Sequence, residues 1–206
     1  MSKRITVVGG GAAGRRAAIC AAEQGAQVTL LEPNERLGKK LNITGKGRCN
    51  VTNNADIQGL MANISRNGKF LYSTFSDFDG RDAMAFFEAL GVPLKTERGN
   101  RVFPVSDRAF DISGALERRL KRLKVHLVRD RAVSLDIAEE AVRGVRGERG
   151  DYPADAVTLA TGGVSYPAPG PTGQGHWKAD QAGPPAPPPP RSPVPLREPR
   201  QRRATI

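Results

Sequence analysis

A glycine-rich turn after the first apolar run constrains the fold of this chain more than any other feature. Residues 5–8 are mostly β-branched and stop at three consecutive glycines, a pattern typical of a buried parallel strand that ends in a tight turn. The turn has the spacing G-x-G-x-x-G, through Gly9, Gly11 and Gly14. The sequence therefore predicts the first strand and turn of a nucleotide-binding α/β fold.

The residues after the turn complete the expected unit. Residues 12–24 are rich in alanine and predict a helix that lies close on a sheet and ends at Gly25. A second strand is expected at 27–31, followed by Glu32, which lies 18 residues after Gly14. That spacing is close to the one expected of an acid that accepts a hydrogen bond from an adenosine ribose. These elements predict a three-layer α/β domain with a parallel sheet.

Each residue of the turn suits a dinucleotide. Gly9 permits the sharp turn, Gly11 lets a pyrophosphate approach the backbone, and Gly14 allows close contact between helix and strand. The amides at the start of the helix, those of Ala12 and Ala13, add unpaired donors at the positive end of the helix dipole. The alternative is an ordinary α/β turn that binds nothing.

The composition bounds the class of protein. No run of 18 apolar residues exists, so no membrane span is expected. Cys20 and Cys49 lie far apart, which favours the reducing cytoplasm, and Cys20 is expected in the core. The net charge of +11 suggests an anionic partner such as RNA. The basic cluster at 118–124 nevertheless lacks interleaved aromatic residues and is typical of a solvated helix face.

A long polar stretch follows the second strand. Residues 33–54 are rich in glycine, lysine and asparagine, and predict a loop with a functional role. Glycines allow such a backbone to wrap an anion, and Lys39, Lys40 and Arg48 could neutralise it. This loop would extend the phosphate site that the first turn opens.

A series of motifs that begins in this loop carries a specific resemblance. The chain resembles the BaiN-like (aminoacetone-oxidase-like) bacterial FAD-dependent oxidoreductases at residues 38–41, 43–53, 70–72, 86–93, 101–104 and 160–167. The similarity extends from residue 1 to about residue 167. Members of that family are considerably longer, so the resemblance is to an N-terminal portion.

The resemblance implies a Rossmann-like domain of the two-dinucleotide-binding flavoprotein type, with FAD as cofactor and NAD(P)H as a potential electron donor. It places the phosphates and the flavin side near Lys39, Lys40, Gly45, Gly47, Arg48, Cys49, Asn50 and Asn53. It also places the adenine beside the backbone of Val133, and the far flank of the cofactor at Ala160, Thr161, Gly162 and Gly163. The last four residues end an apolar strand, which could also be an ordinary strand followed by a glycine turn.

Cys49 is the candidate redox residue of the loop. Lys46 and Arg48 beside it predict a lowered thiol pKa. No second cysteine lies nearby, so packing or cofactor contact is the alternative role. His126 has no cysteine or carboxylate at ligand spacing, so no metal site is expected.

The remaining elements are expected from periodicity. Helices are predicted at 56–64 and 80–90, with a third that begins near Asp107 or Asp111 and ends at 123. Strands are predicted at 92–95, 101–105, 125–128 and 132–137, with 125–128 as the third parallel strand, and residues 156–163 have a buried-strand pattern that ends in small residues.

The C-terminal region differs from the rest of the chain. Residues 167–206 hold 12 of the 16 prolines and many arginines, which predicts a disordered tail with polyproline II character after a partial FAD/NAD(P)-binding domain at 1–166. Its P-x-x-P spacing could instead engage an aromatic groove. The family pattern decays after Pro167, which predicts a truncated member.

The predicted function is that of an FAD-binding oxidoreductase acting on a small unsaturated or amine substrate. No catalytic acid or base can be named from the sequence, and the substrate and oligomeric state stay open. The alternatives are a non-catalytic fragment, a basic RNA- or ribosome-associated flavoprotein, and a domain that uses NAD alone. Glu32 argues against NADP, since a carboxylate repels a 2′-phosphate.

Overall fold

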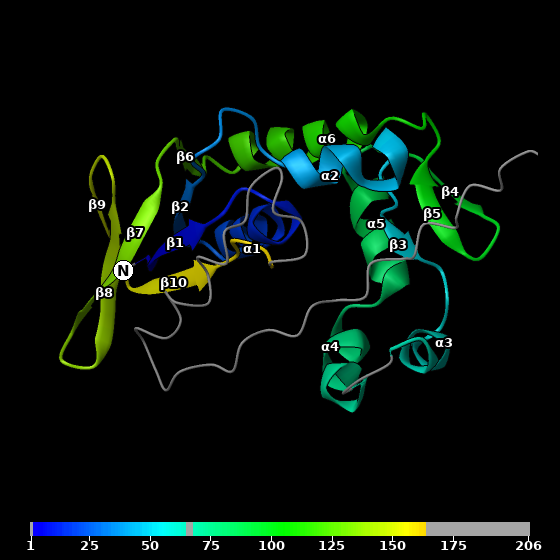
Figure 1. The fold of residues 1–206 in the computed structure, drawn as a ribbon, viewed down its shortest axis with the longest axis horizontal. Helices are drawn as coiled ribbons and strands as arrows, with labels where there is room; N and C mark the ends of the chain where they lie inside the picture. Colours follow the sequence, from blue (N-terminus) through cyan, green and yellow to red (C-terminus); the bar gives the residue numbers. More distant parts are fainter. Residues whose placement is uncertain (1, 65–67, 164–206) are drawn as a thin grey trace, which may run out of the picture.

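A four-stranded parallel sheet forms the centre of the fold. The computed structural model describes residues 2–64 and 68–163. The sheet has the order β10-β1-β2-β6 (Figure 1), and its strands are β1 (Arg4–Val8), β2 (Gln27–Leu31), β6 (His126–Val128) and β10 (Ala156–Leu159). All of its neighbours pair in parallel, with Val8 opposite both Leu31 and Leu159. Each strand predicted for this sheet is therefore confirmed.

Helices cover one face of this sheet. Helix α1 (Ala12–Glu23) and helix α6 (Ala109–Arg122) pack against β1 and β2 through a buried apolar cluster. Alternate residues of the strands, Val7 on β1 and Leu30 on β2, point into this cluster. The burial of these side chains holds the glycine turn at the edge where the strands end.

A three-stranded antiparallel sheet covers the opposite face. It consists of β7 (Ala132–Ala138), β8 (Ala141–Gly147) and β9 (Asp151–Pro153), in that order. Val8 and Leu31, which point away from the helices, pack there against Ala132 and Val145. The domain therefore has three layers, as predicted, and the Rossmann-like α/β class is confirmed.

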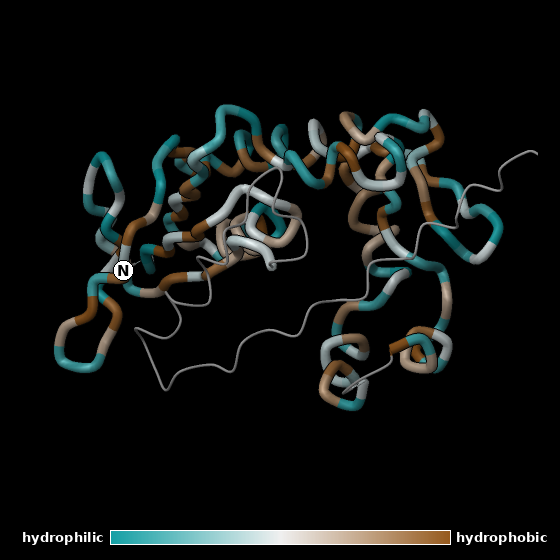
Figure 2. The backbone as a smooth tube through the Cα atoms, viewed as in Figure 1, coloured by the Kyte–Doolittle hydropathy of each residue, from teal (hydrophilic) through white to brown (hydrophobic). Residues whose placement is uncertain are grey.

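A second group of elements extends from α6 (Figure 1). It contains α2 (Lys39–Ile43), the 3-10 helices η1 (Thr44–Gly47) and η2 (Gly68–Leu71), β3 (Thr52–Asn53), α3 (Ile57–Ala62), α4 (Tyr72–Asp77), α5 (Gly80–Ala89), β4 (Leu94–Glu97) and β5 (Arg101–Pro104). The strands form an antiparallel sheet of order β3-β5-β4. Figure 2 shows hydrophilic residues at the tip of the β4–β5 hairpin and apolar ones on β5.

Three sequence-based expectations about local structure were wrong. The stretch 33–54 is not a loop throughout, because it contains α2, η1 and β3. Neither Asp107 nor Asp111 caps α6: Arg108 occupies the N-cap position, and Asp107 pairs with Arg48 and Lys95 instead. Cys20 is exposed rather than in the core, since α1 turns that side away from the sheet. The predicted tail at 167–206 lies outside the described residues.

A buried carboxylate joins β6 to the antiparallel layer. Asp130 is only 2% exposed, and it accepts hydrogen bonds from the Tyr152 hydroxyl at 2.7 Å and from the amides of Arg131 and Arg149. Burial works to raise the pKa of Asp130, but these hydrogen bonds outweigh it and hold the pKa below its usual value. The ionised carboxylate therefore stabilises the fold.

We expect Asp130→Asn to lower the free energy of unfolding at pH 7 by about 1–3 kcal/mol, because an amide would face these donors. A carboxyl with a lowered folded pKa stabilises above its unfolded pKa of about 3.9, and that contribution is lost as the pH falls through the folded value. Urea unfolding at pH 7 and about pH 2.5 should show the difference from wild type shrinking in acid.

Asp136→Asn, on the neighbouring strand β7, is the matched control. Asp136 forms an exposed ion pair with Arg146, so its loss should cost under about 1 kcal/mol. An equal loss in the Asp130 variant at both pH values would contradict the assigned role of the charge.

Candidate functional site

The glycine turn joins β1 to α1 through close backbone contacts. The Gly9 amide donates to the Leu31 carbonyl at 2.8 Å, which fixes the end of β1 beside the end of β2. A Cβ atom on Gly14 would lie 1.8 Å from the Gly9 carbonyl oxygen, and one on Gly9 would lie 2.4 Å from the Ala160 carbonyl oxygen. Side chains are thus excluded at both positions by the approach of helix and strands.

The Glu32 carboxylate points at this turn. One of its oxygens accepts a hydrogen bond from the Gly10 amide at 2.8 Å. The other accepts from the Asn34 amide at 2.9 Å and from the Asn34 side chain at 2.5 Å. Lys39 in turn donates to the Asn34 side-chain oxygen at 2.5 Å. A half-buried carboxylate is therefore held beside the glycine turn, at the end of β2.

The helix end above the turn is open. Gly11 is the N-cap of α1, and a Cβ atom on it would meet nothing within 4 Å. Ala12 and Ala13 are exposed. Among the residues that the structure describes, no side chain caps this end of the helix. Free amides, a positive helix end and an adjacent carboxylate fit the diphosphate and ribose of an adenine dinucleotide.

Two further sequence-predicted segments occupy different places around this turn. Ala160 donates its amide to the Val8 carbonyl at 2.8 Å, so the predicted stretch Ala160, Thr161, Gly162 and Gly163 begins in contact with the turn. Val133 is 44% exposed and sits at an irregularity in β7, between Ala132 and Ser134. The adenine contact predicted for its backbone stays a prediction.

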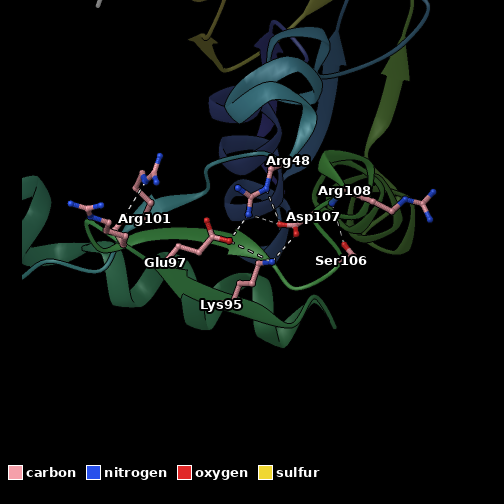
Figure 3. Close-up of polar contacts among 8 residues, drawn as sticks. Arg48, Lys95, Glu97, Arg101, Ser106, Asp107 and Arg108 are labelled. Carbon is pink, nitrogen blue, oxygen red and sulfur yellow. Dashed lines mark hydrogen bonds and ion pairs between the residues drawn. The ribbon is translucent and has the colours of Figure 1, made fainter.

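The predicted phosphate-binding loop lies mostly against the β3-β5-β4 sheet. Arg48 pairs with Glu97 and with Asp107 (2.6 Å), as Figure 3 shows. Its guanidinium also lies 4.1 Å from the centre of the Phe103 ring. Lys95 completes this cluster of charges. In this conformation Arg48 is engaged by two carboxylates, so its charge is not free to neutralise a phosphate.

The two asparagines of the loop are also used within that sheet. The Asn53 side chain donates to the Gly99 carbonyl at 3.0 Å, and the Asn50 amide is placed to donate to the Val102 and Thr52 carbonyls. Gly45 and Gly47 have left-handed backbone and are exposed. Lys39 lies next to Asn34, as described, whereas Lys40 is half-buried. Among the three cations predicted to neutralise an anion, Lys39 is connected to Glu32 by hydrogen bonds through Asn34.

Cys49 is buried in the apolar cluster around α5 and α6. It is 4% exposed and packs with Val92, Ala109 and Ile112. Burial raises the pKa of the Cys49 thiol to about 11, although the Arg15 charge opposes this rise. The expected lowered pKa was wrong, because Arg48 turns to its own carboxylates. A neutral, enclosed thiol favours packing over redox chemistry.

Several residues of the site escaped the sequence analysis. Gly10 donates to Glu32 and accepts from the Gly38 amide at 3.1 Å, so it links the turn to α2. Asn34 orients Glu32, and Arg15 is buried beneath the turn. Asn34 lies two residues after the acid, and this spacing could have identified it. The contacts of Arg15 depend on α6, which is distant in sequence.

Within residues 2–64 and 68–163, no group of three or more His, Cys, Asp or Glu side chains is arranged to hold a metal ion. No described helix has the length and apolar character needed to span a membrane.

Comparison with known proteins gives related sequences and folds. The HI0933-like protein Rossmann domain matches residues 3–189. A 3-dehydro-bile acid delta(4,6)-reductase of Clostridium scindens is 37% identical over 185 residues, which are 87% of this chain and 44% of that protein. A ribosomal RNA dihydrouridine synthase of Escherichia coli is 28% identical over 178 residues, 86% of this chain and 44% of that protein. The chain thus spans under half the length of these relatives.

A solved structure shares the fold. The 3-ketosteroid-delta4-(5alpha)-dehydrogenase of Rhodococcus jostii RHA1 superposes with a TM-score of 0.62 and 17% identity. The match covers 80% of this chain and 47% of that one. This likeness supports the arrangement of layers described above.

We expect Gly14→Ala to lower the free energy of unfolding by at least about 2 kcal/mol, since the new methyl group would overlap the Gly9 carbonyl and force α1 away from β1. The control is Gly114→Ala in the middle of α6. Its new methyl group would meet only the flexible end of Arg118, at 3.3 Å, and the better helix former should gain up to about 1 kcal/mol. Urea unfolding of both variants measures these opposite signs. A Gly14 variant as stable as wild type would disprove the close contact.

Proposed function

Because the chain belongs to the HI0933-like Rossmann domain family, we propose that its glycine turn and Glu32 bind the ADP half of FAD. Membership of this family supports the predicted class, a flavoprotein oxidoreductase with FAD as cofactor. The observation that carries the proposal is the Glu32 carboxylate, fixed 2.8 Å from the Gly10 amide beside the open end of α1. The ribose would lie at Glu32 and the diphosphate over the amides of Gly11, Ala12 and Ala13.

The chain's own residues bind and orient the cofactor in this proposal. Bound FAD supplies hydride transfer at its isoalloxazine ring. The turn and α1 hold the diphosphate, Glu32 and Lys39 flank the ribose side, and the segment after β10 borders the cofactor. Arg48 stays paired with Glu97 and Asp107 in this arrangement. Backbone amides and Lys39, rather than Arg48, would therefore meet the phosphates.

We propose a carbon–carbon double bond beside a carbonyl as the reducible group. Two of the relatives are named for reductions: one is a 3-dehydro-bile acid delta(4,6)-reductase, and the other forms dihydrouridine in ribosomal RNA. Both start from such a conjugated double bond. NAD(P)H is the proposed electron donor, and the two unpaired cysteines favour the reducing cytoplasm as the compartment.

RNA is the second candidate partner. Two of the curated relatives are named as ribosomal RNA dihydrouridine synthases, and Arg118, Lys121 and Arg122 are exposed on α6 of this basic chain. Binding through these side chains would weaken steeply as salt rises, whereas salt-insensitive binding would exclude this surface.

We expect Gly11→Ala to keep the fold and to weaken FAD binding at least about 10-fold, because its methyl group would occupy the space where the diphosphate approaches the backbone. The Gly11 backbone, at φ −72° and ψ −169°, accommodates alanine without strain. Flavin fluorescence or calorimetric titration measures the affinity, and thermal unfolding verifies the fold.

Gly150→Ala, in the turn between β8 and β9, is the matched control, since its new Cβ would meet the Tyr152 hydroxyl at an ordinary 3.9 Å. Its FAD affinity should equal that of wild type. Equal affinities of the Gly11 variant and wild type would place the cofactor elsewhere, and a wild-type chain that takes up no FAD would refute the proposal.

A further inference from the structure

Arg15 is a fully buried cation directly beneath the glycine turn. It follows Gly14 on α1, and its side chain has no solvent exposure. Arginine is almost never buried in this way unless it is paired. The position therefore needs a physical explanation.

The contacts of Arg15 leave part of its guanidinium without a partner. Nη1 donates to the Ser113 carbonyl at 3.1 Å and to the Ser113 hydroxyl at 3.0 Å, and Nε donates to the Gly11 carbonyl at 3.4 Å. Nη2 is buried and has no hydrogen-bond acceptor among the described residues. It is closely enclosed, since a Cβ on Gly38 would lie 2.2 Å from it.

No carboxylate of the described residues forms an ion pair with Arg15. Burial lowers the pKa of Arg15, and Glu117, Cys49 and Glu32 oppose this change only from beyond ion-pair distance. Arginine nevertheless stays protonated in proteins. The protein without a ligand therefore holds a buried positive charge that its own carboxylates compensate only weakly.

We propose that Arg15 is a buried counter-charge for the diphosphate of the ligand at the glycine turn. Nε of the guanidinium lies 3.4 Å from the carbonyl oxygen of Gly11, the N-cap of α1, and the exposed residues Ala12 and Ala13 follow directly. Attraction between the cation and the diphosphate passes through a weakly polarisable interior, so it persists without direct contact. Arg15 thus destabilises the free protein and strengthens binding of a diphosphate. This inference rests on the proposed function.

The test compares Arg15→Met with Arg16→Met in the purified chain. Both variants remove one positive charge from α1, but Arg16 lies over the rings of Phe78 and Phe86 and not beneath the turn. Arg15→Met should have an unliganded melting temperature equal to or above that of wild type, because an apolar side chain of similar volume replaces an unpaired buried charge. Its affinity for FAD and for ADP should fall at least about 10-fold, with adenosine binding unchanged.

The control and the conservative variant complete the design. Arg16→Met should bind FAD and ADP as wild type does, and Arg15→Lys, which keeps the charge, should retain most of the affinity. Three results for Arg15→Met would overturn the inference: lower stability than wild type, failure to fold, or an equal loss of adenosine and ADP affinity. Each would show that Arg15 only supports the structure of the turn. Equal losses in Arg15→Met and Arg16→Met would also overturn it. A wild-type chain that binds neither FAD nor ADP would instead remove the proposed function itself.

Discussion

The hydrogen bond from the Gly10 amide to the Glu32 carboxylate is the interaction on which the site depends. It joins the turn after β1 to the residue that ends β2, so it exists only if the two strands pair in the observed parallel register. A shift of the pairing by one residue would turn every strand side chain to the opposite face and move the carboxylate away from the turn. Packing of Val7 and Leu30 against α1 on one side, and of Val8 and Leu31 against β7 and β8 on the other, fixes that register.

The same arrangement gives the site its polarity. The ends of β1 and β2 place a carboxylate, free helical amides and a buried guanidinium around the glycine backbone. A ribose, which donates hydrogen bonds, suits the carboxylate, and a diphosphate suits the amides and the cation. The turn carries no side chains that would separate ligand from backbone. The site therefore suits a dinucleotide, whose ribose would donate to the carboxylate and whose diphosphate would accept from the amides.

Patterns of neighbouring residues were sufficient to predict the centre of the fold, but they were insufficient to predict the contacts of the loop that follows it. The strand, glycine turn, helix and acid at 5–32 lie close in sequence, and each residue type has one role there, so their positions could be predicted. Arg48 and Cys49 could not be assigned in the same way. Their partners, Glu97, Asp107 and Ile112, lie 49 to 63 residues further along the chain, and those contacts determine the charge that Arg48 offers and the protonation of Cys49. The prediction for Cys20 was wrong because the buried side of α1 carries Ala18 and Ile19, and Cys20 follows them on the exposed side.

The most direct test of the account is an amide-resolved NMR titration of the isotopically labelled chain with ADP, which carries the ribose and diphosphate without the flavin ring. We expect the largest shifts at the amides of Gly10, Gly11, Ala12 and Ala13, with saturation on adding excess ligand, because Gly10 donates to the carboxylate that would hold the ribose and the other three would meet the diphosphate. Shifts confined to the basic face of α6, or no shifts at all, would contradict the claim that the glycine turn and Glu32 hold the adenine dinucleotide.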